Sequence, residues 1–144
     1  MNLEGNMKVL VSACLLGENC KYNGGNNDNA RVKAFLEGKE IIPVCPELLA
    51  GLGVPRTPIE IVHGKVVDKN GNCVDEAIRG AVKACVDEAL EVGVELAILK
   101  ARSPTCGVKE VYDGTFSGRL IKGQGVLAEA LQKAGILVVD DEDI

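Results

Sequence analysis

Three runs of nearly continuous apolar residues, at positions 7–13, 40–44 and 94–99, most limit what this chain can fold into. Apolar and polar residues do not alternate within them, which is typical of parallel strands covered on both faces. A fourth strand is expected at 136–139. Helices are predicted between the strands from helical spacing and from capping residues such as Asn29 and Asp75, over residues 30–36, 47–50, 75–92 and 125–133.

The alternation of strands and helices predicts a single α/β domain over residues 1–144, with its core at about 7–139. The expected architecture is a mostly parallel sheet flanked by helices, in a Rossmann-like, three-layer arrangement. A small β-hairpin is expected to interrupt this order at 59–68. Residues 1–6 are predicted to be a frayed start and residues 140–143 an acidic end.

The composition argues against several classes of partner. The net charge is −5, so the chain lacks the basic surface that binding to DNA requires. No run approaches the roughly 18 apolar residues of a membrane-spanning helix. The segment Val11–Cys14 resembles a lipoprotein cleavage box, but the apolar stretch before it is too short for an export signal. We therefore expect a reducing cytoplasm, where cysteines serve metals or catalysis more often than disulfides.

Three of the six cysteines share one type of position. Cys14, Cys45 and Cys106 each lie beyond the end of an apolar run, in a turn or at a helix start. If the runs are parallel strands, the three thiols converge at the carboxyl edge of the sheet, where ligands bind. The chain has one histidine, so three converging thiolates indicate a soft metal centre with an open position. No pair has the Cys-x-x-Cys spacing of a zinc knuckle, which disfavours a structural zinc site.

The other cysteines have different surroundings. Cys85 lies on the apolar stripe of the helix at 75–92 and is expected to be buried, and Cys73 is expected to be a surface thiol. Cys20 follows Cys14 by six residues and is a spare thiol, a fourth metal ligand or a sulfur acceptor. Two other interpretations therefore stay open: a non-catalytic metal-binding protein, such as a zinc site that uses Cys20, and a binding module with structural cysteines.

Polar residues lie next to these cysteines. Glu47 follows Cys45 at a helix start, and Ser103 lies three residues before Cys106. A carboxylate and a hydroxyl beside a metal suit proton transfer to a leaving group. Arg56, between two prolines, is a candidate clamp for a polar ligand. The loops at 112–118 and 123–125 are expected to line a pocket, and the remaining candidates for substrate contact are Cys20 and Lys100.

The segments around these residues resemble the signature blocks of the thiouracil desulfidase family. The resemblance runs from about residue 7 to residue 139. Lys21 and Asn23 stand where arginine and aspartate are common in that family, which bears on substrate preference and not on the cluster. The blocks are Ser12-Ala-Cys-Leu-Leu-Gly17, Cys20-Lys-Tyr-Asn-Gly24, Val44-Cys-Pro-Glu47, Pro55-Arg-Thr-Pro-Ile-Glu60, Leu99-Lys-Ala-Arg-Ser-Pro-Thr-Cys-Gly107 and Tyr112-Asp-Gly-Thr-Phe116.

The resemblance implies a 4Fe-4S cluster bound by Cys14, Cys45 and Cys106, with the fourth iron free to bind the sulfur of a thio-substituted pyrimidine. The implied reaction is non-redox and converts C=S to C=O with water as the oxygen source. The acid/base residues of the family match Glu47 and Ser103. The acidic chain favours a free base or nucleoside over tRNA as substrate. The cluster is expected to be oxygen-sensitive and absent from aerobically prepared protein, and sulfur transfer on another thio-compound is the rival reaction.

Overall fold

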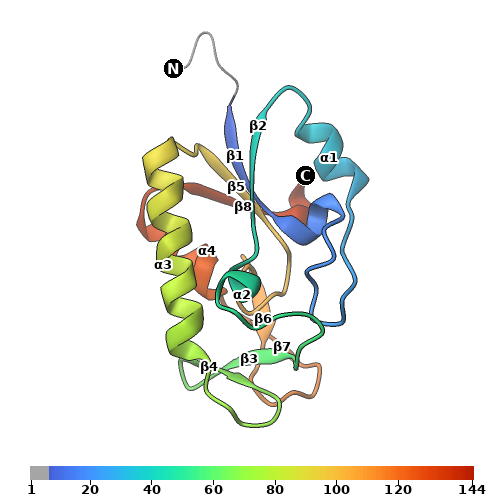
Figure 1. The fold of residues 1–144 in the computed structure, drawn as a ribbon, viewed down its shortest axis with the longest axis vertical. Coiled ribbons are helices and arrows are strands. Elements are labelled where there is room, and N and C mark those ends of the chain that lie inside the picture. Colours follow the sequence, from blue (N-terminus) through green and yellow to red (C-terminus); the bar gives the residue numbers. More distant parts are fainter. Residues whose placement is uncertain (1–6) are drawn as a thin grey trace.

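A computed structural model describes residues 7–144, and the expected frayed start at 1–6 lies outside the described residues. Its central sheet has four parallel strands in the order β2-β1-β5-β8 (Figure 1). Each strand falls within or beside a predicted apolar run, so the expected α/β fold with a mostly parallel sheet is confirmed. The strands are β1 (Lys8–Ser12), β2 (Glu40–Val44), β5 (Leu96–Leu99) and β8 (Leu137–Asp140).

Successive side chains of the central strands point to opposite faces of the sheet. Leu10 of β1 therefore packs into the core beneath the longest helix, whereas Val9 and Val11 pack into the core on the other face. All three side chains have no exposed surface. This double burial explains why the sequence of β1 is apolar without alternation.

Helices cover both faces of the sheet, as the three-layer prediction requires. In Figure 1, α3 and α4 lie on one side of the strands, and α1 lies on the other with the C-terminal end of the chain. Short 3₁₀ helices, η1 and η2, directly follow β1 and β8. The helices are η1 (Ala13–Leu16), α1 (Ala30–Phe35), α2 (Pro46–Leu49), α3 (Asp75–Val92), α4 (Val126–Lys133) and η2 (Asp141–Asp143).

The ends of the helices follow local capping chemistry, with one exception. The Asn29 side chain accepts hydrogen bonds from the first backbone N–H groups of α1, as predicted for a cap. Gly93 ends α3 with φ of 80°. Asp75 was expected to cap α3, but Val74 occupies the cap position. The Asp75 carboxylate instead accepts from the Val66 N–H at 3.0 Å and pairs with Arg79, so it ties the helix to a hairpin.

Helix α3 packs on the sheet through the predicted apolar stripe. Ile78, Val82, Cys85 and Ala89 are all buried in the core. Burial raises the pKa of Cys85 to about 11, so this thiol is neutral and acts as a small apolar side chain.

We expect Cys85→Ala to lower the free energy of unfolding by about 1 kcal/mol, because it removes one buried sulfur from a packed core. Chemical denaturation followed by circular dichroism measures this change. The matched control is Cys73→Ala, since Cys73 is exposed and its substitution should stay within about 0.5 kcal/mol. Equal losses in the two variants would contradict the core position of Cys85.

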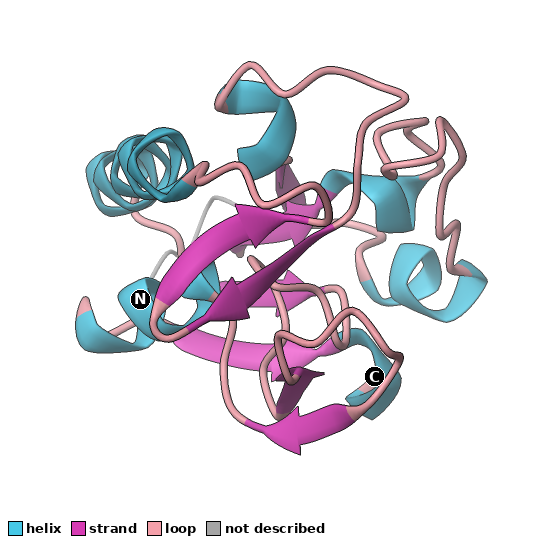
Figure 2. Cartoon of the chain, turned by 90° about the horizontal axis from the view of Figure 1, so that it is seen from below, coloured by secondary structure: helices cyan, strands magenta, loops and turns pink. Residues whose placement is uncertain are grey.

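Two antiparallel hairpins lie beyond the carboxyl ends of the central strands, at the lower end of Figure 1, and Figure 2 views the molecule from that end. The first hairpin, β3 (Ile59–Val62) and β4 (Lys65–Asp68), was predicted. The second, β6 (Glu110–Tyr112) and β7 (Leu120–Lys122), was not, because its three-residue strands are too short for a recognisable pattern. The loop between β6 and β7 is held by Glu60, whose carboxylate accepts from the N–H groups of two of its residues.

The acidic end is folded against the sheet. Asp140 ends β8 and caps η2, and both Asp140 and Asp141 are buried. Burial raises the pKa of the Asp140 carboxyl. Within residues 7–144, no helix combines the length and the apolar character that a membrane crossing needs.

Candidate functional site

A cavity of about 360 Å³ opens at the carboxyl edge of the central sheet. Its walls come from the segments that follow β1, β2 and β5, and Ile59 and Tyr112 of the hairpins line it as well. Ligands of open α/β sheets bind at this edge. The eight residues singled out from the sequence all line this one cavity: Cys14, Cys20, Cys45, Glu47, Arg56, Lys100, Ser103 and Cys106. The structure therefore brings them together, and their roles stay predictions.

The three strand-end cysteines reach the cavity from three different turns. Cys14 lies in η1, which begins directly after β1, and the Asn27 side chain donates a hydrogen bond to its sulfur at 3.4 Å. Cys45 occupies the N-cap position of α2, where Pro46 begins the helix. Cys106 lies in the loop between β5 and β6 and is 5 % exposed. Each thiol is therefore fixed by a backbone turn at the end of a strand.

Burial raises the pKa of three thiols of the pocket. It raises the pKa of Cys106 to about 12, and it raises the pKa of Cys14, although the hydrogen bond from Asn27 opposes the shift. The pKa of Cys20 is raised to about 12 by burial and by the neighbouring Cys45. A metal centre bound here must displace these protons, as thiolate ligation always requires.

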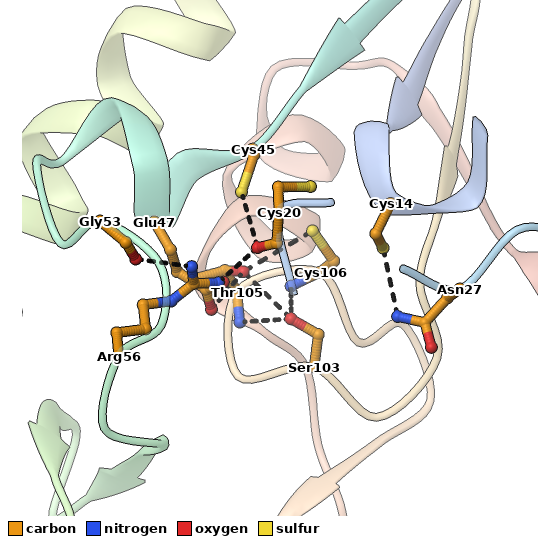
Figure 3. Close-up of polar contacts among 10 residues, drawn as sticks. All are labelled: Cys14, Cys20, Asn27, Cys45, Glu47, Gly53, Arg56, Ser103, Thr105 and Cys106. Atoms are coloured by element: carbon orange, nitrogen blue, oxygen red, sulfur yellow. Dashed lines mark hydrogen bonds and ion pairs between the residues drawn. The ribbon is translucent and has the colours of Figure 1, made fainter. Parts of the chain in front are cut away.

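The arrangement of the thiols bears on what the pocket can hold. Figure 3 shows the sulfurs of Cys14, Cys20, Cys45 and Cys106 around one shared space. In the described part of the chain, no three Cys, His, Asp or Glu side chains come close enough together to hold a single metal ion. A soft, all-sulfur donor set spread over three turns suits a larger iron–sulfur group.

A buried ion pair fixes the carboxylate of Glu47. Arg56 Nη2 donates to Glu47 Oε2 at 2.6 Å, and the two side chains are only 6 % and 15 % exposed. Arg56 also donates to the backbone carbonyls of Gly53 and Cys20, at 3.0 and 2.8 Å. The guanidinium predicted to clamp a ligand thus holds Glu47 and the Cys20 segment in place. Removing one partner of such a pair leaves an unpaired buried charge, which costs about 3–5 kcal/mol.

Ser103 organises the turn that ends in Cys106. Its hydroxyl oxygen accepts from the backbone N–H groups of Thr105 and Cys106, at 3.2 and 3.0 Å (Figure 3). The Gly107 N–H donates to the Ser103 carbonyl at 2.7 Å and closes the same turn. The expected approach of Ser103 toward Cys106 is therefore present.

Lys100 begins this loop at the end of β5. Its backbone N–H donates to the Ser12 hydroxyl at 2.9 Å, and its side-chain ammonium donates to the Ala101 carbonyl at 3.3 Å. The positive charge opposes the rise in the pKa of Cys14. Lys100 therefore places a cation at the cavity wall, where it can meet a polar substrate group.

Comparison with known proteins agrees with this geometry. The family model described as 2-thiouracil desulfurase matches residues 9–143. The chain belongs to this family. It is 36 % identical over 146 residues to the uncharacterized protein YbbK of Bacillus subtilis (strain 168), covering 94 % of this chain and 97 % of that protein. A solved structure of the [4Fe-4S]-dependent thiouracil desulfidase TudS matches with a TM-score of 0.90 and 31 % identity, over 96 % of this chain and 93 % of that one.

In this member of the 2-thiouracil desulfurase family, the C-terminal acids position the loop that carries Ser103 and Cys106. The Ala101 N–H donates to Asp141 at 2.7 Å. Arg102, with φ of 65°, forms two hydrogen bonds to the Glu142 carboxylate. The predicted acidic end is therefore part of the site architecture.

Helix α4 packs against the other side of the same loop. The Leu127 N–H donates to the Thr105 carbonyl at 2.8 Å. A Cβ atom on Gly125 would lie 2.5 Å from that carbonyl, so the close approach requires glycine. The Gly125 that sequence inspection placed in a pocket-lining loop thus supports the cysteine loop.

Asn27 and Thr105 are polar residues of the site that were not singled out from the sequence. Asn27 lies in a turn-rich segment, and Thr105 lies inside the block that contains Ser103 and Cys106. Its position between Ser103 and Cys106 could have indicated Thr105 as a residue of the site. No local pattern indicated Asn27, because its contact with Cys14 spans 13 residues of irregular chain.

Proposed function

We propose that this protein removes sulfur from a thio-substituted pyrimidine base or nucleoside without net oxidation or reduction. Water and the thiocarbonyl compound give the carbonyl compound and hydrosulfide, with release of one proton. The observation that carries the proposal is the shared cavity, in which three cysteines of a 2-thiouracil desulfurase family member meet a carboxylate and a hydroxyl. We place the reaction in the reducing cytoplasm, within one domain that spans the chain.

The donor set of the cavity fits the 4Fe-4S group named for the structural relative. We assign Cys14, Cys45 and Cys106 as the residues that hold it. When bound, the cluster supplies a soft Lewis-acid iron for the thiocarbonyl sulfur. Cys20 lines the same cavity but is left outside the ligand set, and its backbone carbonyl lies 3.9 Å from the Cys45 sulfur.

Glu47 and Ser103 accept and donate the protons that move in this reaction. Water must lose a proton as it adds to the thiocarbonyl carbon, and the departing sulfur must gain one. Arg56 binds one oxygen of Glu47, and the other oxygen, Oε1, accepts from the Thr105 hydroxyl at 3.4 Å. Ser103 offers a hydroxyl whose orientation is set by two backbone N–H groups.

The size and charge of the site favour a small substrate. A cavity of about 360 Å³ lies in the range of small-molecule sites. Arg56, Lys100 and Cys20 line it and are our candidates for substrate contact. The net charge of −5 disfavours a tRNA substrate, because a long phosphate backbone needs a basic surface.

A substrate panel tests the proposal. Protein prepared without oxygen is offered 2-thiouracil, 4-thiouracil, 4-thiouridine and thiouridine monophosphate, and loss of the thiocarbonyl absorbance is followed together with hydrosulfide. We expect turnover of at least one compound, with one hydrosulfide for each thiocarbonyl lost. Cluster-loaded protein that turns over none of them would contradict the proposed function.

The rival reaction is sulfur transfer on another thio-compound, in which Cys20, which lines the cavity, takes the outer sulfur of a persulfide donor while the donor's thiol leaves. It predicts that Cys20→Ser abolishes turnover, because the sulfur acceptor is lost. Our assignment predicts that Cys20→Ser retains the iron content and most of the turnover, as measured by iron analysis and hydrosulfide release. Loss of iron from this variant would show a fourth protein ligand and would contradict the three-cysteine site.

A further inference from the structure

The hydroxyl of Thr105 lies at the centre of the polar groups of the site. Thr105 is 1 % exposed, so its hydroxyl has no contact with bulk water. Its oxygen lies 3.1 Å from Ser103 Oγ, 3.4 Å from Glu47 Oε1 and 3.6 Å from Cys106 Sγ (Figure 3). Thr105 is thus the residue that connects Ser103 to Glu47.

The hydrogen bonds around Ser103 give this connection a direction. A hydroxyl oxygen has two lone pairs and one proton. Both lone pairs of Ser103 are used by the backbone N–H groups of Thr105 and Cys106, so its proton remains for donation. Within residues 7–144, Thr105 Oγ1 is the one side-chain acceptor within reach of the Ser103 hydroxyl.

Thr105 in turn has one proton to give. Of its neighbours, the Glu47 carboxylate is the strongest acceptor, because charged acceptors form the stronger hydrogen bonds. The other oxygen of Glu47 is already bound by Arg56, which leaves Oε1 for Thr105. The chain of donation therefore runs from Ser103 through Thr105 to Glu47.

We propose that Thr105 is a positioning residue that passes a proton between Ser103 and Glu47 during desulfuration, an inference that rests on the proposed function. Ser103 gives its proton to Thr105 and, as the O–H bond of the attacking water breaks, accepts that proton in place of its longer backbone hydrogen bond, the one from the Thr105 N–H at 3.2 Å. Thr105 then gives its proton to Glu47, where a new O–H bond forms. Each hydroxyl ends with the proton count it began with, and the reverse transfer returns the proton to the departing sulfur.

A pair of substitutions tests this role. Thr105→Val keeps the shape of the side chain and removes the hydroxyl, whereas Thr105→Ser keeps the hydroxyl. We expect Thr105→Val to lower kcat by about 10-fold or more with little change in KM, because the variant lacks a group that transfers a proton in the chemical step. Thr105→Ser should restore most of the turnover. Iron content and thermal unfolding, measured on the same preparations, report whether either variant has lost the site itself.

The Glu47→Gln background separates a relay from independent effects. If Thr105 acts through Glu47, Thr105→Val should cause no further loss of turnover in Glu47→Gln. Full additivity of the two losses would overturn the proposal, and so would equal impairment of Thr105→Val and Thr105→Ser. Normal turnover of cluster-loaded Thr105→Val would overturn the relay while leaving the desulfurase function intact. Absence of turnover by the unsubstituted enzyme would instead overturn the proposed function.

A proton inventory on the unsubstituted enzyme tests the relay without relying on the folding of a variant. Single-turnover rates are measured in mixtures of light and heavy water. Because several hydroxyl protons move in one step, the rate should depend on the deuterium fraction along a curve. A linear dependence, which indicates one proton in motion, would overturn the proposal.

Discussion

Replacing Cys14, Cys45 or Cys106 by serine, one at a time, should abolish retention of the cluster. Each of these cysteines reaches the cavity from a different strand end, so each supplies one point of a three-point attachment. A serine hydroxyl is a hard and poorly ionised ligand for iron. After anaerobic reconstitution, the unsubstituted protein should contain about four irons and four acid-labile sulfides per chain, as a 4Fe-4S centre requires.

The control for this series is Cys73→Ser, which makes the same chemical change at an exposed thiol that does not line the cavity. It should keep the full iron content and the brown colour. Retention of about four irons by any one of the three site variants would show that the corresponding cysteine is not a ligand. Thermal unfolding of the apo proteins should be similar throughout, so loss of iron would not reflect loss of the fold.

Replacing Glu47 by glutamine should lower turnover by roughly 100-fold or more, the usual scale for losing a general acid or base. Glutamine keeps the shape of the side chain and removes the proton acceptor. The variant should still bind iron, because Glu47 is not among the assigned ligands. The substitution also leaves the Arg56 charge without its carboxylate, so unfolding must be measured beside turnover.

Glu37→Gln is the matched control, because Glu37 is exposed on the surface. This variant should turn over the substrate at the normal rate. Ser103→Ala should lower turnover in the same direction as Glu47→Gln. Normal turnover by cluster-loaded Glu47→Gln would show that Glu47 is merely a residue of the first turn of α2. The proton route would then have to run through water or another side chain.

Much of the fold could be predicted because short, local sequence patterns determine its strands and helices. The apolar runs behind β1 and β5 are buried on both faces, and this burial is what removes the polar alternation. Strand β2 lies at the edge of the sheet and is partly exposed, with Ile41 at 40 %. The parallel direction of these strands then brings their carboxyl ends to one edge. The shared position of Cys14, Cys45 and Cys106 followed from that rule together with the chain order.

Other features depend on contacts between distant residues and left no local signal. The bond from Ala101 to Asp141 joins residues 40 positions apart, and that from Thr105 to Glu47 joins residues 58 apart. Neither could be inferred from spacing. The burial of Asp141 also could not be predicted, because a run of four acidic residues normally indicates a solvated end of the chain.

The roles of individual residues form a third class. Composition and position suggested a soft metal centre, but the assignment of the 4Fe-4S cluster and of Glu47 and Ser103 as acid/base residues came from the family resemblance. The ion pair of Glu47 with Arg56 is visible only in three dimensions. It explains how a residue of a four-residue helix can hold a fixed position in the cavity.

The most direct test of the account is the origin of the oxygen atom in the product. Cluster-loaded enzyme is given 2-thiouracil in water enriched in oxygen-18, without oxygen gas or an added reductant, and the uracil formed is analysed by mass spectrometry beside the hydrosulfide released. Our account predicts that each uracil carries one oxygen-18 at the former thiocarbonyl carbon and that one hydrosulfide appears for each uracil. Unlabelled uracil, or a loaded enzyme that releases no hydrosulfide, would contradict hydrolytic desulfuration by this protein.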